Sequence, residues 1–193
     1  MLCAGGDLST ERLLLAYQRG IFPWFSEGEP ILWWSPDPRL VLQPEAFRLR
    51  KSLRQSIKKQ RLTVRVNTDF DAVMALCASE RENREGTWIT ATMRDAYSAL
   101  NHRGFGFSAA TWIDDTLVGG LYGVKIGQVL FGESMVSRVP DASKAALATI
   151  CQTADQHQIR LIDCQVPTSH LQSLGASLIT RSEFVQQLAR LIP

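Results

Sequence analysis

The sequence has little of what membrane proteins and metalloproteins require. None of its apolar runs approaches the roughly 20 residues of a membrane-spanning helix, and residues 1–9 lack the basic start of a signal peptide. Its four cysteines form no C-x-x-C pair and its three histidines are scattered, so no metal site is expected. We therefore expect a globular, cytoplasmic protein that contacts no membrane and keeps its thiols reduced.

Net charge is also small, +2 over 193 residues, but the cations are unevenly distributed. Between Phe47 and Val66 there are eight Lys and Arg residues and no acid. Leu49, Leu53 and Ile57 recur at every fourth position, which predicts a helix with one apolar stripe and cations over the rest. Such cations can contact a phosphate backbone of any sequence, although a solvated surface helix is the alternative. The candidates for nucleic-acid contact are Arg50, Lys51, Arg54, Lys58, Lys59 and Arg61.

The order of the predicted elements indicates an α+β fold. A helix capped by Ser9 and short aromatic strands between residues 21 and 39 predict a small N-terminal lobe with an aromatic hairpin, which together with the basic helix occupies residues 1–61. The elements expected beyond it are a strand at 62–67, helices at 69–79 and up to 102, strands at 107–113, 116–124 and 128–133, a helix at 142–157, a strand at 160–166, a helical turn after 168, a strand at 177–180 and a helix from 182. This is the element order of an acetyltransferase-like (GNAT-like) domain, a mixed sheet flanked by helices, and we assign it to residues 62–193.

Two carboxylates lie in strands that are otherwise apolar. Asp163 and Gln165 alternate along one strand and share a face, whereas Cys164 between them points to the opposite face. Burying a carboxylate is costly unless it is paired, so Asp163 either has a structural partner or faces a site that receives a cation. Glu133, at the expected end of another strand, poses the same alternative. Two such carboxylates suit a substrate amine, because an α-amino group has a pKa of about 8 and needs only modest help to lose a proton.

Several segments, spread over nearly the whole chain, combine tryptophan, proline and glycine in an unusual way. They are Ala4–Ser9, Ala16–Phe25, Ile31–Arg39, Gly86–Thr90, Leu117–Gly123, Phe131–Met135, Ala142–Lys144 and Leu161–Val166. Together they resemble the leucyl/phenylalanyl-tRNA–protein transferase family. A block of this composition and length rarely recurs by chance, so the resemblance is more specific than any single motif.

The resemblance implies an aminoacyltransferase that uses no cofactor. Its donors are aminoacyl-tRNAs charged with Leu, Phe or Met, and its acceptors are proteins that begin with Arg or Lys and are thereby marked for N-end rule proteolysis. The catalytic pair falls on Asp163 and Gln165, and Glu133 binds the acceptor or orients the reacting groups. The implied aminoacyl-adenosine site comprises Trp24, Trp88, Tyr17 and Ser134, with Leu121, Leu130 and Ile162 as candidates for the pocket of the donor side chain. We expect a monomer.

Three positions depart from the family's usual residues. Phe107 and Ala110 stand where the family more often has His and Glu, and Val136 replaces a frequent Phe. The sequence therefore predicts a changed outer wall of the site with the same chemistry.

Two other functions remain open at the level of sequence. A coenzyme A-dependent N-acetyltransferase shares the element order, but it needs a glycine-rich turn for the pyrophosphate, and residues 137–143 lack one. A non-catalytic RNA-binding module would explain the basic helix and the aromatic residues, yet would leave Asp163, Gln165 and Glu133 without a role. For Trp24, Trp88 and Tyr17 the alternative to a ligand wall is the core of the small lobe.

Overall fold

The computed structural model describes the backbone of residues 1–85 and 88–192, and the side chains of these residues except 81–85. Gly86 and Thr87, part of one segment that resembles the family, lie outside the described residues. The elements are β1 (Cys3–Ala4), α1 (Thr10–Gln18), β2 (Phe22–Pro23), β3 (Leu32–Trp34), β4 (Arg39–Leu42), the 3-10 helix η1 (Pro44–Ala46), α2 (Lys51–Lys59), β5 (Thr63–Val66), α3 (Phe70–Glu85), α4 (Ala91–His102), β6 (Gly106–Ile113), β7 (Thr116–Ile126), β8 (Val129–Ser137), α5 (Ala142–Gln152), β9 (Leu161–Gln165), α6 (Ser169–Ser173), β10 (Ser177–Ile179) and α7 (Arg181–Leu191).

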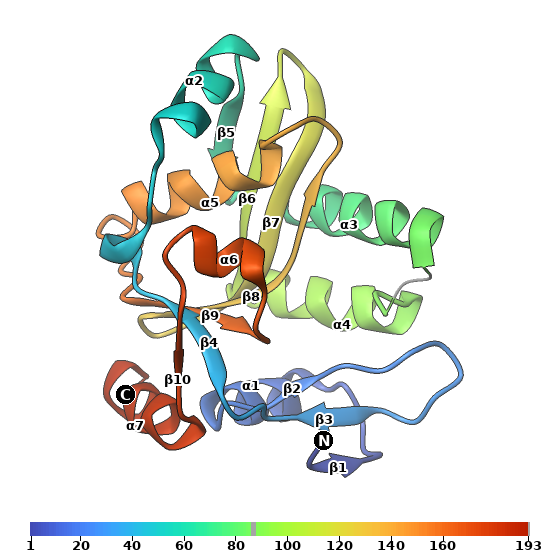
Figure 1. Ribbon diagram of the computed structural model, residues 1–193. Helices are drawn as coiled ribbons and strands as arrows, with labels where there is room; N and C mark the ends of the chain where they lie inside the picture. The colour runs from blue at the N-terminus through green and yellow to red at the C-terminus, as the bar shows by residue number, and fades with distance from the viewer. Residues whose placement is uncertain (86–87, 193) are drawn as a thin grey trace.

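A seven-stranded mixed sheet forms the centre of the molecule, in the order β10-β4-β9-β8-β7-β6-β5. Every neighbouring pair is antiparallel except β8 and β9, which are parallel. Helices α3 and α4 cover one face and α5 covers the other (Figure 1). From β5 onward the order of strands and helices is the one that the sequence predicts, which confirms the α+β fold with an acetyltransferase-like order.

Local sequence explains why these elements begin where they do. The side chain of Thr90 accepts a hydrogen bond from the N–H of Met93 at the start of α4, and Thr180 and Glu183 form a reciprocal capping box at the start of α7. In β7, a Cβ on Gly119 would lie 2.6 Å from the Cβ of Ala142. Glycine therefore lets α5 pack closely against the sheet.

A small sheet in the order β1-β3-β2 lies beside α1 at one end of the molecule (Figure 1). It corresponds to the expected aromatic hairpin, with β1 as an additional strand. Leu13 and Tyr17 of α1 are fully buried in the same core cluster as residues of α3, α4 and the large sheet. The chain then enters the large sheet at β4, which pairs with β9 and β10, well before the boundary at residue 61 that we expected between the two parts.

Three elements differ in length from the sequence-based expectation. Helix α3 continues to Glu85 instead of ending near Ser79, because the charged residues that follow include no glycine or proline and are mostly good helix formers. Helix α5 ends at Gln152 and not at His157. Strand β8 runs on to Ser137, so Glu133 lies inside a strand and not at its end.

Candidate active site

The two parallel strands at the centre of the sheet, β8 and β9, pair only over their first three residues. The pairing of β8 with β9 stops at Phe131 and Asp163. Beyond that point a pocket with a volume of about 270 Å³ opens between the strands and α6. It is lined by Leu121, Gly132, Glu133, Ser134, Met135, Leu147, Ile162, Asp163, Cys164, Gln165, Val166, Thr168, His170 and Leu171. We call it the apolar pocket, because aliphatic side chains form most of its wall.

Strands β8 and β9 each have a register shift against a neighbouring strand at their polar residues, and the shift changes the direction of the side chains there. On β8, Gly132 pairs with Gly123 and Ser134 pairs with Tyr122, so Glu133 is the extra residue of a β-bulge. Bulges re-aim side chains and recur beside active sites. Glu133 thus turns toward the pocket although it lies within a strand.

Strand β9 is shifted in the same way against β4. Leu40 pairs with Gln165 and Val41 pairs with Asp163, which leaves Cys164 as the extra residue. Gln165 has a φ of 63°, a left-handed conformation that is uncommon for a residue with a side chain. Simple alternation along the strand was therefore wrong for Cys164, which lines the apolar pocket together with Asp163 and Gln165. Burial raises the pKa of the Cys164 thiol well above its usual range, which disfavours the thiolate form that a nucleophilic cysteine requires.

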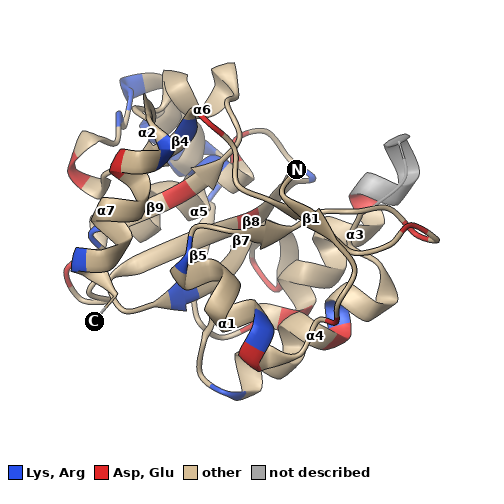
Figure 2. Cartoon of the chain, turned by 90° about the horizontal axis from the view of Figure 1, so that it is seen from below, with Lys and Arg blue, Asp and Glu red and all other residues tan. Residues whose placement is uncertain are grey.

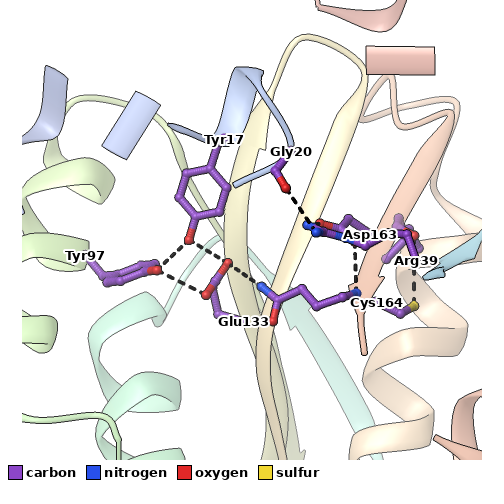
Figure 3. Close-up of polar contacts among 9 residues, drawn as sticks. Tyr17, Gly20, Arg39, Tyr97, Glu133, Asp163 and Cys164 are labelled. Carbon is purple, nitrogen blue, oxygen red and sulfur yellow. Dashed lines mark hydrogen bonds and ion pairs between the residues drawn. The ribbon is translucent and has the colours of Figure 1, made fainter. Parts of the chain in front are cut away.

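Glu133 is the centre of a buried hydrogen-bond network (Figure 3). Its Oε1 accepts bonds from the hydroxyl of Tyr17 at 2.7 Å and from the Nε2 of Gln165 at 3.2 Å, and its Oε2 accepts one from the hydroxyl of Tyr97 at 3.1 Å. The two tyrosine hydroxyls also lie within hydrogen-bond distance of each other, so their two hydrogens are shared among three contacts. Burial raises the pKa of Glu133 to about 7 despite the hydrogen bonds that favour its charged form.

Asp163 is fully buried and is paired with a cation from the same chain. Its Oδ1 accepts a bond from the Nε of Arg39 at 2.8 Å and its Oδ2 one from Nη2 at 2.6 Å. The same Oδ1 also accepts the backbone N–H of Gln165 at 2.9 Å. Of the two alternatives that the sequence left open for Asp163, the structural partner is therefore present.

A second pocket, also of about 270 Å³, adjoins the first. It is lined by Phe22, Pro23, Trp24, Trp88, Glu133, Gln165, Val166 and Thr168, and we call it the aromatic pocket. Glu133, Gln165, Val166 and Thr168 line both pockets. A ligand with an apolar arm and a flat aromatic arm can therefore occupy both, with its middle against Glu133 and Gln165.

The residues expected to bind the donor fall into two groups. Leu121, Ile162 and Ser134 line the apolar pocket, and Trp24 and Trp88 line the aromatic pocket.

The other two donor candidates lie elsewhere. Tyr17 is fully buried against Phe131, with ring centroids 4.9 Å apart, and presents only its hydroxyl to Glu133. Leu130 lies in the core beneath α5. Neither side chain lines the apolar or the aromatic pocket. Strand alternation directs Leu130 to the face under α5, and Tyr17 lies on the buried side of α1.

Sequence reasoning missed two residues that contact the site. Arg39 was noticed only as the end of a family-like segment, and Tyr97 not at all. Both reach the site from elements that are distant in sequence, so no local spacing could connect them with Asp163 or Glu133. A buried arginine in an apolar strand, as Arg39 is, would have been the available signal.

The three unusual positions are core residues in this structure. Phe107, Ala110 and Val136 are buried, and none of them lines either pocket. The expected change in the outer wall of the site was therefore wrong for these positions, since their side chains fill the space between the sheet and its helices.

The segment that leads into the basic helix α2 contacts the C-terminal end of α6, and α2 itself packs against α5. The Nη2 of Arg50 donates to the carbonyl of Ser173 at 3.4 Å, and the N–H of Arg48 donates to the carbonyl of Leu174 at 2.8 Å. The six candidate cations, Arg50, Lys51, Arg54, Lys58, Lys59 and Arg61, are all exposed. Figure 2 shows Lys and Arg colouring on this helix. The helix therefore offers an exposed cationic surface, joined to α6 through the residues that precede it.

Over the part of the chain that the structure describes, no group of three or more His, Cys, Asp or Glu residues could hold a metal ion. None of the described helices is long and apolar enough to cross a membrane.

Comparison with known proteins gives a consistent result at the level of sequence. A family model described as leucyl/phenylalanyl-tRNA protein transferase matches residues 41–189, and a model for the N-terminal domain of that family matches residues 6–37. The leucyl/phenylalanyl-tRNA–protein transferase of Pseudomonas fluorescens (strain Pf0-1) is 54% identical over 98% of this chain and 84% of its own length. The protein of the same name from Methylococcus capsulatus is 55% identical over 95% of this chain and 78% of its own length.

Solved structures resemble the chain more distantly. The structure of L-PGS from Bacillus licheniformis aligns with a TM-score of 0.50 and 12% identity over 84% of this chain and 54% of that one. A GCN5-related N-acetyltransferase from Kribbella flavida aligns with a TM-score of 0.45 and 12% identity over 85% of this chain and 58% of that one. At such identity a likeness concerns the fold alone.

Proposed function

The chain belongs to the leucyl/phenylalanyl-tRNA–protein transferase family, and from that premise we propose how its site moves an amino acid from a tRNA to a protein. It is an aminoacyltransferase, and its substrates are an aminoacyl-tRNA and an acceptor protein. The observation that supports our assignment of the site is the meeting of an apolar and an aromatic pocket at Glu133 and Gln165.

The donor end of the tRNA fits the two pockets in one orientation. The side chain of Leu, Phe or Met occupies the apolar pocket, among Leu121, Met135 and Ile162. The terminal adenosine lies against Trp24 and Trp88, since a base stacks favourably on aromatic side chains. The ester that joins amino acid and ribose then lies at the junction, beside Glu133 and Gln165. A pocket of this kind discriminates against β-branched Ile and Val by shape, at about 1–3 kcal/mol per methylene-sized difference.

The reaction at the junction forms one bond and breaks one. The α-amine of the acceptor attacks the ester carbonyl carbon, a C–N bond forms, and the C–O bond to the ribose breaks. One ammonium proton passes to Glu133, whose pKa of about 7 lies close to the value of about 8 for the amine. A second proton leaves the new amide nitrogen for the departing ribose oxygen.

Gln165 and Asp163 orient the reacting groups in this scheme. The Nε2 of Gln165 donates to Glu133, and the carbonyl of the same amide can accept an N–H of the attacking amine. Asp163 accepts the backbone N–H of Gln165 and is paired with Arg39, so it holds Gln165 in place. Of Asp163, Gln165 and Glu133, we therefore assign the proton to Glu133.

Charge complementarity determines where the tRNA body and the first residue of the acceptor bind. The body of the tRNA runs from the pockets along α6 to the cations of α2, because Arg50 contacts the end of α6. Acceptors begin with Arg or Lys, whose positive charge is attracted to the carboxylate of Glu133 at the junction. The product is marked for N-end rule proteolysis in the cytoplasm. A monomer suffices, since one chain supplies every side chain named.

The N-terminus of α5 argues against coenzyme A as the donor. Acetyltransferases of this fold hold a pyrophosphate at the corresponding helix. Here Asp141 is the residue that precedes α5, paired with Lys144 at 2.7 Å. A carboxylate at that position repels a pyrophosphate.

A transfer assay tests the proposed function. Purified protein, mixed with Leu-tRNA and a peptide beginning with Arg, should yield the peptide extended by Leu, as followed by mass spectrometry. The matched peptide beginning with Ala should not react. Acetyl transfer from acetyl-CoA, with no product from charged tRNA, would instead identify an acetyltransferase.

A further inference from the structure

Arg39 is a fully buried arginine held by three hydrogen bonds (Figure 3). Its Nε and Nη2 bind the two carboxylate oxygens of Asp163, and its Nη1 donates to the carbonyl of Gly20 at 3.0 Å. The guanidinium lies between two aromatic rings, 4.9 Å from the centroid of Phe22 and 4.5 Å from that of Phe184. Charge, hydrogen bonds and stacking all fix one orientation of this side chain.

These partners come from three separate parts of the chain. Gly20 follows α1 and Phe22 begins β2, Asp163 lies on β9, and Phe184 lies on α7. Arg39 itself starts β4, where the chain passes from the small sheet into the large one. It therefore joins the segment that carries the aromatic pocket to the strand that carries Gln165.

The contacts of Arg39 continue to the site without a gap. The carboxylate that it holds accepts the backbone N–H of Gln165, and the Gln165 side chain donates to Glu133. Gln165 has a left-handed backbone at the end of β9, a conformation that persists only where the surroundings enforce it. A fully buried ion pair contributes little net stability compared with apolar residues of similar volume, so its stability alone does not account for the arrangement.

We propose that Arg39 is a positioning residue for aminoacyl transfer, which through the Arg39–Asp163 pair holds the backbone of Gln165 and the Gly20–Trp24 segment in the arrangement that the reaction needs. This role rests on the proposed function. Arg39 touches neither pocket, so it acts through Asp163 and Gly20.

The test is the variant Arg39→Lys, compared with Phe184→Leu as a matched control. Lysine keeps the charge but cannot bind both carboxylate oxygens and Gly20 in a planar fork. Phe184→Leu removes one of the flanking rings and leaves every hydrogen bond of Arg39 in place. Thermal unfolding measures how far each variant is destabilised, and the assay is run well below both midpoints.

For Arg39→Lys we expect kcat for Leu transfer to fall by about 10- to 100-fold, the loss typical of a misplacement near 1 Å. Binding of Leu-tRNA, measured by filter retention, should stay within about threefold of wild type, since the cations of α2, which contact the phosphate backbone, are untouched. Phe184→Leu should retain most of kcat. Should Arg39→Lys not fold, Arg39→Gln, whose amide still donates to Asp163, is expected to show the same selective loss of kcat.

Two results would overturn the role of Arg39. One is an unchanged kcat in a folded Arg39→Lys or Arg39→Gln protein. The other is an equal loss of kcat in Phe184→Leu at equal loss of stability, which would make the effect one of packing. An inactive wild-type protein would overturn the proposed function itself, and this role with it.

Discussion

At the scale of single residues, Glu133 combines burial with a titration near neutral pH. Burial raises its pKa to about 7, so its charge changes in the range where the transfer reaction is expected to run. For wild type, kcat/KM should rise with pH through about 7 as Glu133 becomes able to accept a proton. Glu133→Gln should lack this rise and lose about 100-fold or more in kcat, the usual contribution of a general base. Initial rates between pH 5.5 and 8.5 measure both effects.

The same residue predicts how stability depends on pH. A carboxyl whose pKa is higher in the folded state stabilises the fold below its unfolded pKa, and that contribution is lost as pH rises through the folded value. The free energy of unfolding of wild type should therefore decline between about pH 4.5 and pH 7, by on the order of 3 kcal/mol from this group. Urea unfolding of Glu133→Gln should show no such decline. A decline of equal size in the variant would assign it to other groups.

The residue types in the strands predicted which polar side chains lie together at the site, but not the backbone geometry that brings them together. Asp163, Gln165 and Glu133 were singled out because acids and amides are rare in apolar strands, and all three line the apolar pocket. The rule of alternation could not foresee the two bulges, since a bulge depends on the register with a neighbouring strand. Arg39 and Tyr97 were missed for a related reason, because each is brought to its carboxylate only by the fold.

At the scale of elements, α2 is an exposed helix with a charge that the fold does not require. Replacing Lys58 and Lys59 with Gln should weaken tRNA binding and reduce the slope of log K against log salt by roughly 1.5, since each phosphate contact contributes about 0.7 to 0.9. Catalysis at saturating tRNA should change little. Filter binding at several salt concentrations measures the slope.

A charge-matched control separates this surface from a general effect of net charge. Arg19 and Arg190 are also exposed. Arg19 follows α1 and Arg190 lies on α7, and both helices are away from α2 in Figure 1. Arg19→Gln with Arg190→Gln should leave the salt slope almost unchanged. An equal reduction by both pairs would contradict a tRNA surface on α2.

Hydrophobic periodicity predicted the type of these elements better than their ends. The fourth-residue repeat of Leu49, Leu53 and Ile57 gave α2 correctly, and Leu53 is buried as expected. The end of α3 was placed too early because a charged run was taken for a loop, although charged residues favour an exposed helix. The division at residue 61 came from composition alone, which cannot reveal that β4 joins the large sheet by pairing with β9.

At the scale of the whole molecule, the small sheet and α1 share their core with the large sheet. Leu13, Tyr17 and Phe22 belong to one buried cluster with residues of α3, α4 and β8. We therefore expect a single cooperative unfolding transition, with coincident curves from far-UV circular dichroism and from tryptophan fluorescence. Trp33 reports on the small sheet and Trp112 on the large one. Separate transitions for Trp33→Phe and Trp112→Phe proteins would indicate two independent units.

The stacking of Phe184 on Arg39 has a consequence for protein synthesis. The ribosome delivers the chain from its amino end, so β4 and β9 leave the exit tunnel before α7 does. A nascent chain can pair these strands and collapse its core, yet Arg39 then lacks one of the two rings that hold it. We therefore expect Arg39 to take its final orientation only after α7 has been synthesised, later than the pairing of β4 with β9.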